Sequence, residues 1–271
     1  MSTALNFDAV LPIITRDVGM LTGAMVIRHS TRKYSTSPVD HEALTALQAY
    51  AEELSTVCAD VRLCMGDATP DSKLFKLEKI RRASCKNASH FCVGLVRTDS
   101  VGSDAWVGLL GEMYILKAAS LGVHTCWIGG TLRKAEVLKS IAPEGEWTVS
   151  FITPLGNPET PTQGFPVRKR KELSKMVSTA RPLSDWERRA AEAMQSAPSA
   201  LNKQPRTMSV ENGSITLREE GKGKESPSGG MTKRLDTCIA LTHVLAQLAK
   251  DGKIRTVETV SSLPLVVRIS Q

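Results

Sequence analysis

The stretch Arg28-His29-Ser30-Thr31-Arg32-Lys33-Tyr34 organises the rest of the sequence. If it is extended, alternate side chains point the same way, so Arg28, Ser30 and Arg32 share one face. Two guanidinium groups with a hydroxyl between them suit a phosphate, which accepts paired, charge-assisted hydrogen bonds. A solvated basic loop could carry the same residues, so the motif needs support from a second signal.

That second signal is Ala197-Pro198-Ser199-Ala200-Leu201-Asn202-Lys203-Gln204-Pro205, far downstream. Together the two stretches resemble the nitroreductase family of FMN-dependent oxidoreductases. Chains of that family typically begin with R-[HR]-S-x-R-x-[YF], followed by a helix and a P-S-x-x-N-x-Q-P loop. Both pieces are present here, but most of the chain lies between them.

Length and composition are those of a soluble globular protein. The chain has 271 residues, of which 41% are hydrophobic and 23% are charged, ordinary values for such a protein. No apolar run reaches the length needed to span a membrane. Leu5–Val26 is fairly apolar, but Asp8, Arg16 and Asp17 interrupt it, so we expect a buried N-terminal arm or a short helix there instead of a signal peptide.

The chain is basic, with a formal charge of +7 and a pI near 9.1. Such a charge is compatible with nucleic-acid binding. However, only 4% of residues are aromatic, so few rings are available to stack on bases. We interpret the charge as attraction for a phosphorylated cofactor and for anionic nucleotides, with no nucleic-acid or membrane partner.

The six cysteines form no C-x-x-C pair. Without a secretory signal, reduced thiols in a cytoplasmic protein are expected. His124 and Cys126 lie close together, but a metal site needs more ligands than this pair offers. No metal site is predicted.

Hydrophobic periodicity and capping residues predict alternating helices and strands. Expected helices are His41–Leu54 capped by Asp40, Asp71 or Ser72 to Arg82, Asp104–Leu121 ended by Gly122, Leu132–Ile141, a helix from the capping box at Ser184 to about Gln195, and one capped by Asp236 that runs to Lys250 before Gly252. Expected strands are Val61–Met65, Phe91–Val96, Trp147–Leu155, the hairpin Arg206–Val210 and Ser214–Arg218, and Leu263–Ile269. Glu159–Ser178 is expected to be a connector and Gly221–Gly230 a flexible loop.

The order helix, strand, long helix, strand occurs twice, which suggests internal duplication. The segments that resemble each other are Pro38–Leu54 and Pro182–Ala197, Val61–Met65 and Arg206–Val210, Gly108–Gly122 and Leu235–Gly252, and Val149–Leu155 and Leu265–Ile269. We therefore expect two related halves, residues 1–175 and a shorter 176–271, packed as one unit. The expected fold is α+β and nitroreductase-like, with a central, mostly antiparallel sheet flanked by helices and the two halves interlocked.

In the family that the chain resembles, two identical subunits interlock and each flavin lies at their interface. One subunit supplies the arginine motif and a glycine-bearing loop, and the other supplies the P-S-x-x-N loop. Here the two halves carry complementary parts. The first has Arg28, His29, Ser30, Arg32, Trp127, Ile128, Gly129 and Gly130, and the second has Pro198, Ser199, Ala200 and Asn202. The resemblance implies a covalent pseudo-dimer with one FMN site across its internal interface.

The resemblance also implies roles for individual residues. Arg28 and Arg32 would hold the phosphate, and Arg168 or Arg170 would add a third cation unless that cluster is only solvated surface. Asn202 would pair with the edge of the flavin pyrimidine ring, or else cap the turn after its helix. Gly129 and Gly130 would let the backbone approach the flavin, although an ordinary strand-to-helix turn would also use them.

The implied function is that of an FMN-dependent NAD(P)H oxidoreductase. By ping-pong hydride transfer it would reduce nitroaromatic, quinone or similar flat conjugated acceptors, with no catalytic side chain because the flavin carries the chemistry. Its partners would be small molecules, and the chain would be a monomer, as an internal pseudo-dimer, or a weak homodimer. The alternatives are a flavin-binding carrier or sensor without turnover and, third, a nucleic-acid-binding protein.

Overall fold

The computed structural model describes residues 5–69, 72–75, 84–130, 132–160, 169–222 and 232–271. Its elements are α1 (Leu11–Arg16), α2 (Val18–Ile27), α3 (His41–Ser55), β1 (Val61–Asp67), β2 (His90–Arg97), α4 (Ser103–Ser120), α5 (Lys134–Ile141), β3 (Trp147–Leu155), η2 (Leu173–Lys175), β4 (Val177–Thr179), α6 (Asp185–Ser196), η3 (Ala200–Asn202), β5 (Arg206–Glu211), β6 (Ser214–Glu219), α7 (Lys233–Lys250), β7 (Thr256–Ser262) and β8 (Leu265–Ser270). The order of helices and strands is that of an α+β protein, as expected.

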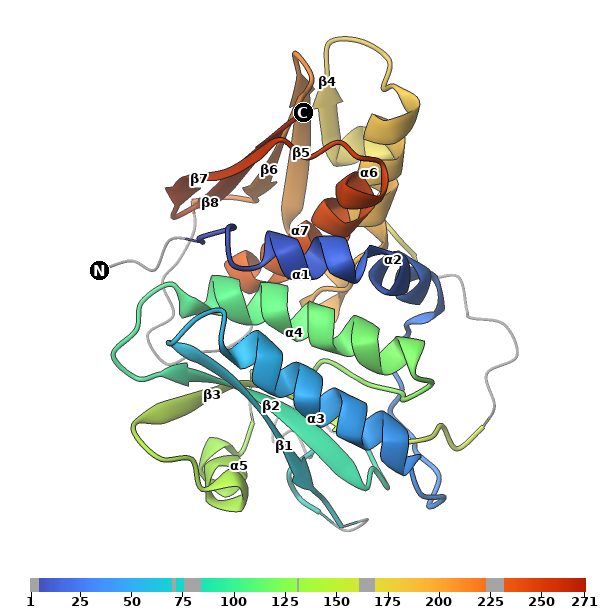
Figure 1. Cartoon of the computed structure of the whole chain (residues 1–271), viewed down its shortest axis with the longest axis vertical. Coiled ribbons are helices and arrows are strands. Elements are labelled where there is room, and N and C mark those ends of the chain that lie inside the picture. Colours follow the sequence, from blue (N-terminus) through green and yellow to red (C-terminus); the bar gives the residue numbers. More distant parts are fainter. Residues whose placement is uncertain (1–4, 70–71, 76–83, 131, 161–168, 223–231) are drawn as a thin grey trace.

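Two sheets lie on either side of a central layer of helices (Figure 1). This corrects the expectation of a single central sheet flanked by helices, because each half forms a sheet of its own. One sheet has the strand order β1-β2-β3 and is antiparallel throughout. The other has the order β4-β5-β6-β8-β7 and is antiparallel except for the parallel pair β4 and β5. Each sheet draws all of its strands from one of the two expected halves, β1 to β3 from the first and β4 to β8 from the second.

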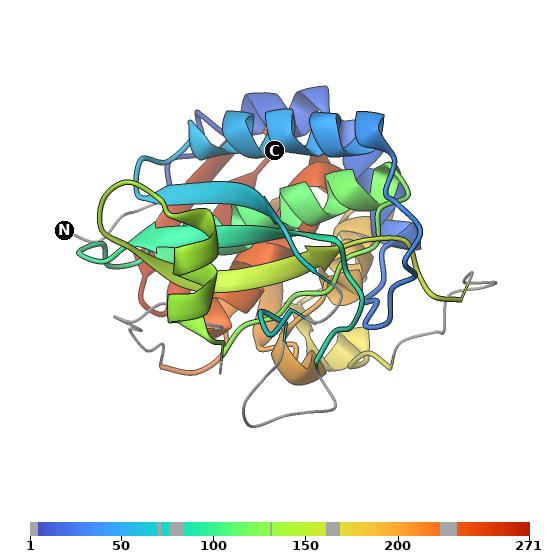
Figure 2. The same cartoon turned by 90° about the horizontal axis from the view of Figure 1, so that it is seen from below.

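The first sheet is covered on both faces, as the alternation of its middle strand requires. Phe91, Val93 and Leu95 of β2 pack into the cluster that contains Val137 of α5. The intervening Cys92 belongs to the cluster formed with α3 and α4. Figure 2 shows α3 and α4 on one side of the strands and α5 on the other. A strand covered on both faces becomes a continuous apolar run, which is why Phe91–Val96 was recognisable in the sequence.

The second sheet buries only one face. Leu217, Val267 and Ile269 are among the residues that face the helices and are fully or almost fully buried. Their neighbours Arg218 and Arg268 are exposed. This alternation between apolar and polar side chains is typical of an antiparallel sheet with one solvated side.

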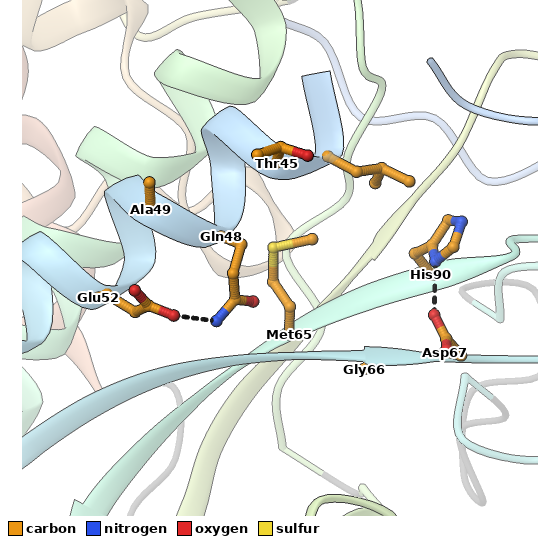
Figure 3. Close-up of a pocket in the computed structure, with 9 residues that line it drawn as sticks. Thr45, Gln48, Ala49, Glu52, Met65, Gly66, Asp67 and His90 are labelled. Atoms are coloured by element: carbon orange, nitrogen blue, oxygen red, sulfur yellow. Dashed lines mark hydrogen bonds and ion pairs between the residues drawn. The ribbon is translucent and has the colours of Figure 1, made fainter. Parts of the chain in front are cut away.

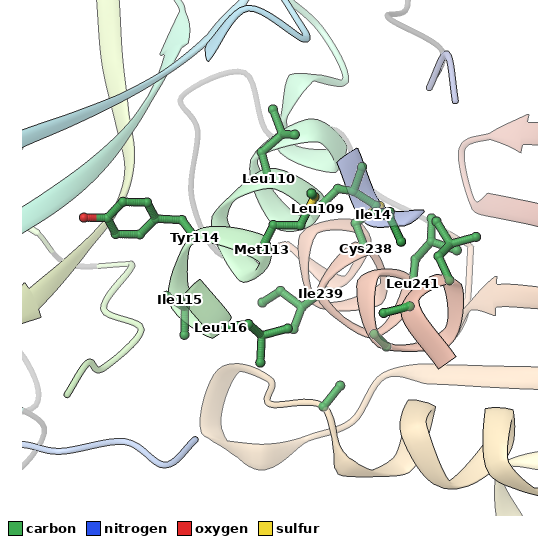
Figure 4. Close-up of a cluster of buried hydrophobic side chains, with 14 of the residues drawn as sticks. Ile14, Leu109, Leu110, Met113, Tyr114, Ile115, Leu116, Cys238, Ile239 and Leu241 are labelled. Atoms are coloured by element: carbon green, nitrogen blue, oxygen red, sulfur yellow. The ribbon is translucent and has the colours of Figure 1, made fainter. Parts of the chain in front are cut away.

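Helices α4 and α7 form the centre of the molecule and pack against each other more extensively than any other two helices. Figure 4 shows Leu109, Met113 and Leu116 of α4 on the side that faces Cys238 and Ile239 of α7. Each such side chain contributes roughly 1.5–3 kcal/mol when it is fully buried. Both helices are apolar on nearly every side because other elements surround them.

The close approach of α4 and α7 depends on Gly108. A Cβ atom at this position would lie 2.4 Å from the carbonyl oxygen of Leu235 and 2.9 Å from the Cβ of Cys238. The hydroxyl of Thr242 also donates to the carbonyl oxygen of Leu109 at 3.0 Å. Since one contact is with backbone, no side-chain rotation could make room for a larger residue at Gly108.

Most of the predicted helix ends are confirmed. The Asp40 carboxylate accepts from the backbone of the first turn of α3. Ser184 and Glu187 form the capping box of α6. Gly122 has a φ of +73° and follows the last residue of α4, which is the left-handed conformation that ends many helices. These signals involve residues close in sequence, which is why the helix ends could be predicted from the sequence alone.

One predicted cap is wrong. Thr232, not Asp236, caps α7, and its side chain accepts from the backbone N–H of Leu235 at 3.0 Å. Asp236 lies inside the first turn, and its carboxylate accepts from the backbone N–H of Ala200 instead. Thr and Asp are both common N-cap residues, so the sequence alone does not show which of the two caps the helix. The contact of Asp236 with a distant loop settles the choice.

Other differences are local. The N-terminal segment forms two helices, α1 and α2, where an arm or one short helix was expected. The expected connector contains the short strand β4, and the exposed strand β7 was not predicted. The helix expected to end at Arg82 and most of the Gly221–Gly230 loop lie outside the described residues, although residues 72–75 form a bend and a turn.

The two halves repeat one another. In each, three strands are antiparallel in the same order, β1-β2-β3 in the first and β5-β6-β8 in the second. Helix α3 packs on α4 as α6 packs on α7. The four pairs of resembling segments found in the sequence fall on corresponding elements.

Candidate functional site

The arginine segment, residues 28–34, runs as extended chain between two other segments. It begins where α2 ends, with φ −63° and ψ 128° at its first residue. Ser30 forms a bridge with Thr125 on one side, and Lys33 forms one with Lys86 on the other. The segment is therefore extended, as the argument from alternating side chains requires.

Arg28, Ser30 and Arg32 act on the same point, the thiol of Cys126. The pKa of this buried thiol is lowered first by a hydrogen bond with Cys85. The charge of Arg32, a hydrogen bond with Ser30 and the charge of Arg28 lower the pKa further, whereas burial raises it. The three side chains thus share one neighbourhood, which is called the cradle below.

The two guanidinium groups of the cradle have unused hydrogen-bonding capacity. The Arg28 side chain is only 4% exposed, and its Nε lies 3.8 Å from Oε1 of Glu112, too far for a hydrogen bond. This Nε is buried and lacks a hydrogen-bond partner. Within the described residues, no hydrogen bond engages the Arg32 guanidinium either, and that side chain is exposed. Because buried donors are normally satisfied, the cradle has the chemistry to receive an anion.

His29 packs beside a second histidine, at a cavity that Arg28 also lines. The hydroxyl of Thr31 lies 3.0 Å from Nε2 of His29 and 2.9 Å from Nδ1 of His124. The two rings meet edge to face, with their centres 4.8 Å apart. Burial, followed by the neighbouring His29, lowers the pKa of His124 to about 4. His29 therefore contacts another imidazole beside a cavity of about 190 Å³.

Trp127 is held firmly in place. Its ring centre lies 4.2 Å from that of Phe151, and its Nε1 donates to Oε2 of Glu112 at 2.7 Å. A Cβ atom at Gly111 would come within 2.6 Å of the indole. The indole is thus packed against the central helix, and its one donor is used internally.

The glycine pair follows directly. Ile128 is bridged to Ile152 of β3, which fixes the start of the loop. Gly129 is half-buried and Gly130 is exposed, with a φ of +79°. Apart from its chain neighbours, no atom of the described residues would lie within 4 Å of a Cβ at Gly130. The left-handed backbone explains this glycine.

Arg206 supports the loop of the second half, residues 197–205. Its fully buried side chain donates to the carbonyl oxygens of Met194 at 3.0 Å, Ala197 at 2.6 Å and Pro198 at 3.1 Å. Burial lowers the pKa of Arg206 to about 10. The guanidinium thus satisfies the carbonyl groups left open where α6 ends.

Other polar groups of the loop also have partners. The Ser199 hydroxyl accepts from the backbone N–H of Gln204 at 2.8 Å. The Asp236 carboxylate accepts from the N–H of Ala200 at 2.9 and 3.1 Å. Burial raises the pKa of Asp236 to about 6. Buried groups of α7 and β5 therefore hold the loop from beneath.

Asn202 joins this loop to the connector. Its Oδ1 accepts from Nη1 of Arg170 at 2.5 Å, and its Nδ2 donates to the carbonyl oxygen of Lys169 at 2.8 Å. Arg170 also donates to the carbonyl oxygen of Ser196 at 2.7 Å. The Asn202 side chain thus makes contacts of its own within the protein. Arg168, the other predicted cation, lies outside the described residues.

A chain of contacts connects the cradle with the loop. The Glu112 carboxylate lies between Arg28 and His243, whose Nε2 donates to it at 2.9 Å. The other ring nitrogen of His243 lies 3.0 Å from the Ser196 hydroxyl. From Ser196 the contacts continue through Arg170 to Asn202, as described above. Residues that are far apart in sequence are therefore brought into one region of the molecule.

Sequence reasoning missed four residues of this region: Glu112, His243, Arg206 and Asp236. A signal existed for two of them. Glu112 and His243 are polar residues in helices that are otherwise apolar on nearly every side, and both are completely buried. Such a residue must have a partner, although the sequence does not say which.

A larger cavity, of about 520 Å³, lies elsewhere, between α3 and the ends of β1 and β2. Figure 3 shows the ring of His90 beside Asp67, with Nδ1 to Oδ1 at 2.8 Å, and Met65 on the floor. None of the predicted site residues lines it. None of the described helices is both long and apolar enough to cross a bilayer.

Comparison with known proteins gives the family. The family described as "Putative TM nitroreductase" matches residues 20–248, which is most of the chain. The protein therefore belongs to this nitroreductase family, and the resemblance inferred from the two motifs is confirmed. Comparison with curated proteins gave no match.

One solved structure shares the fold over nearly the whole chain, and two others are similar to about half of it. A "putative nitroreductase" from Thermotoga maritima MSB8 is 18% identical, with a TM-score of 0.56 over 92% of each chain. A "nitroreductase with bound FMN" from Desulfitobacterium hafniense DCB-2 is 19% identical, with a TM-score of 0.43, and covers 53% of this chain and 91% of its own. A "nitroreductase family protein" from Clostridium difficile 630 is 16% identical, with a TM-score of 0.39 over 52% and 84%. The predicted α+β, nitroreductase-like fold is confirmed.

Proposed function

We propose that the protein is an FMN-dependent NAD(P)H oxidoreductase of the nitroreductase type, with one FMN site formed by both halves. The observation that supports this most strongly is the pair of guanidinium groups in the cradle, Arg28 and Arg32, which no hydrogen bond engages within the described residues. Membership of the nitroreductase family and the FMN named for the Desulfitobacterium protein give the ligand to be tested first.

The residues present fit the phosphate end of FMN. Arg28 and Arg32 would bind the phosphate by charge-assisted hydrogen bonds, beside the Ser30 hydroxyl. Arg170 is a suitable third cation, because it is near enough to Arg28 for that charge to lower its pKa, after the larger effect of burial. A cluster of like charges that repel one another favours a bound anion.

At the other end, the protein would orient the ring. Apart from its chain neighbours, no atom of the described residues crowds Gly130, which would leave its backbone accessible to a flat ligand. The Asn202 amide, already bonded to Arg170, would contribute mainly by fixing the position of that cation. The chemistry supplied by bound FMN would be hydride acceptance from NADH or NADPH and reduction of a nitroaromatic, quinone or similar acceptor.

The proposal includes the organisation of the chain. Residues 1–175 and 176–271 would be the two halves of a covalent pseudo-dimer that acts as a monomer on small molecules. Linking the halves makes the contribution of the second one intramolecular, so no association cost opposes assembly of the site.

The first test is spectroscopic. Purified protein titrated with FMN should show a flavin spectrum that saturates at one FMN per chain, and NADPH should bleach it in the absence of oxygen. Addition of a quinone or nitroaromatic should then restore the colour. Absence of FMN uptake would contradict the proposal, and flavin binding without NAD(P)H oxidation would indicate a carrier or sensor.

The second test removes the cation from the cradle. Arg28→Ala should weaken FMN binding by about 30- to 100-fold, the loss expected for a charge-assisted contact. Riboflavin, which lacks the phosphate, should bind both proteins alike. Arg181→Ala is the matched control, because Arg181 pairs with a buried carboxylate, Glu187, outside this region.

The third test addresses the second half. Asn202→Ala should weaken FMN binding by about 5- to 10-fold, because Arg170 loses one of its two hydrogen-bond partners. Asn157→Ala, which removes an exposed amide bonded to the carbonyl oxygen of Pro38, serves as control. Unchanged FMN affinity and flavin spectrum in Asn202→Ala would contradict a site shared by both halves.

A further inference from the structure

Glu112 is a fully buried carboxylate near the middle of the central helix α4. Both of its oxygens accept a hydrogen bond, one from Nε1 of Trp127 at 2.7 Å and one from Nε2 of His243 at 2.9 Å. Neither donor needs to carry a charge, and burial lowers the pKa of His243. The negative charge of Glu112 must therefore be balanced by something else.

The surroundings of Glu112 contain more positive charge than the hydrogen bonds explain. Arg28 lies at 3.8 Å. Besides burial, the charge of Arg28 lowers the pKa of Arg170, and the charge of Arg170 lowers the pKa of Arg206. The charge of Glu112 acts in the opposite direction on both groups. Glu112 is therefore an anion that acts on all three arginines, although Asp236 acts more strongly on Arg206. Arg170 repels both Arg28 and Arg206.

The pairing between Glu112 and Arg28 is incomplete. Both carboxylate oxygens are already engaged, and the Arg28 Nε has no hydrogen-bond partner among the residues that the structure describes. Glu112 supplies charge to Arg28 without occupying its N–H groups. The guanidinium can consequently accept a second anion, but the carboxylate nearby weakens its attraction for one.

We propose that Glu112 is the internal counter-ion of the cradle: it balances the arginines while the site is empty and opposes the phosphate when that anion binds. The inference rests on the proposed function, because it takes the phosphate of FMN as the incoming anion. It makes Glu112 a positioning residue that lowers phosphate affinity in exchange for stability of the empty protein. If Glu112 only stabilised the fold, removing its charge would lower both the melting temperature and the affinity for FMN.

The decisive variant is Glu112→Gln. Glutamine has the same shape, its oxygen can accept from Trp127, and its NH₂ can donate to the other tautomer of His243. The substitution therefore removes the charge and leaves the hydrogen bonds possible. The melting temperature of the empty variant should fall, because the arginines lose their counter-ion.

Binding should change in the opposite direction. FMN affinity should rise by between threefold and about thirtyfold. This is the range expected when one nearby charge is removed and the effective dielectric constant lies between that of protein and that of water. Riboflavin affinity should stay the same. Inorganic phosphate should raise the melting temperature of the variant more than that of the wild type.

Glu187→Gln is the matched control. Glu187 is also fully buried and paired with an arginine, Arg181. This variant should lose stability as well, but its affinities for FMN and riboflavin should match those of the wild type. The control separates the effect of removing any buried carboxylate from the effect of removing this one.

Equal or weaker FMN binding by Glu112→Gln would overturn the inference, as would a variant that stays unfolded even with phosphate and FMN. The double variant Arg28→Gln with Glu112→Gln adds a measurement that needs no ligand. It should melt higher than Glu112→Gln alone, because the unbalanced cation is gone, and a lower value would contradict the proposal. If the wild type itself takes up no FMN, the proposed function fails, and the phosphate melting experiment still tests the counter-ion.

Discussion

The two parts of the candidate site differ in how their polar groups are satisfied. In the arginine segment, Arg28 has a buried N–H group without a partner, and the exposed Arg32 makes no hydrogen bond within the described residues. In the loop of the second half, Ser199, Asn202 and Ala200 all have partners. Arg206 beneath it donates to three carbonyl groups, and only its Nε has no partner among the described residues. The polar groups of the arginine segment are available to a ligand, whereas those of the loop of residues 197–205 are engaged within the protein. The arginines of the two parts should accordingly have different roles.

The largest loss of stability is expected when the loop loses Arg206. Arg206→Ala leaves three carbonyl groups without their donor and removes the positive charge that acts on the buried Asp236. It should lower the free energy of unfolding by about 3–5 kcal/mol, measured by urea denaturation.

Arg32→Ala is the counterpart from the cradle. It should change the free energy of unfolding by no more than about 0.5 kcal/mol, as is usual for an exposed residue, while weakening FMN binding. Equal losses of stability in Arg32→Ala and Arg206→Ala would show that the arginines of the cradle and of the loop do not differ in role.

An effect of about 3 kcal/mol is expected from Asp236, because burial raises the pKa of its carboxyl group from 3.8 to about 6 and each pKa unit corresponds to about 1.4 kcal/mol. Between about pH 4 and pH 6 the folded chain keeps a proton that the unfolded chain releases, so stability falls as pH rises. Asp236→Asn should abolish this decline while still accepting from Ala200.

The measurement is urea denaturation of both proteins at several values between pH 4 and pH 7. The two stability profiles should converge towards pH 4 and separate as pH rises. Parallel profiles across this range would show that Asp236 is not the group responsible.

The smallest effect concerns backbone strain in the loop. Leu201 has a φ of +51° and is 74% exposed, so its side chain gains little from burial and its backbone is strained. Leu201→Gly should raise the free energy of unfolding by about 0.5 kcal/mol. Leu201→Ala keeps the strain and should give no gain, and a loss of stability in the glycine variant would refute the strain argument.

What could be predicted from the sequence was local. The capping box at Ser184, Gly122 after α4, and the hairpin turn at Asn212-Gly213, where φ is +49° and +77°, each depend on residues a few positions apart. The two motifs were also readable, because a family resemblance needs only short matches. The outlines of most elements followed from these signals.

What could not be predicted depended on long-range contacts. Asp236 looked like a helix cap because its partner, Ala200, is 36 residues away. Glu112 gave no indication of its partner His243, which is 131 residues distant. The strand β7 was missed because its exposed and half-buried residues lack a clear apolar alternation.

The contact between α4 and α7 at Gly108 has a practical consequence. A fragment containing only the first half would expose to water the flank of α4 that normally meets Leu235 and Thr242, and it should aggregate when expressed alone. The two fragments produced together should recombine, since each supplies the surface that the other lacks. The molecule is thus a natural starting point for a split reporter whose signal depends on reassembly.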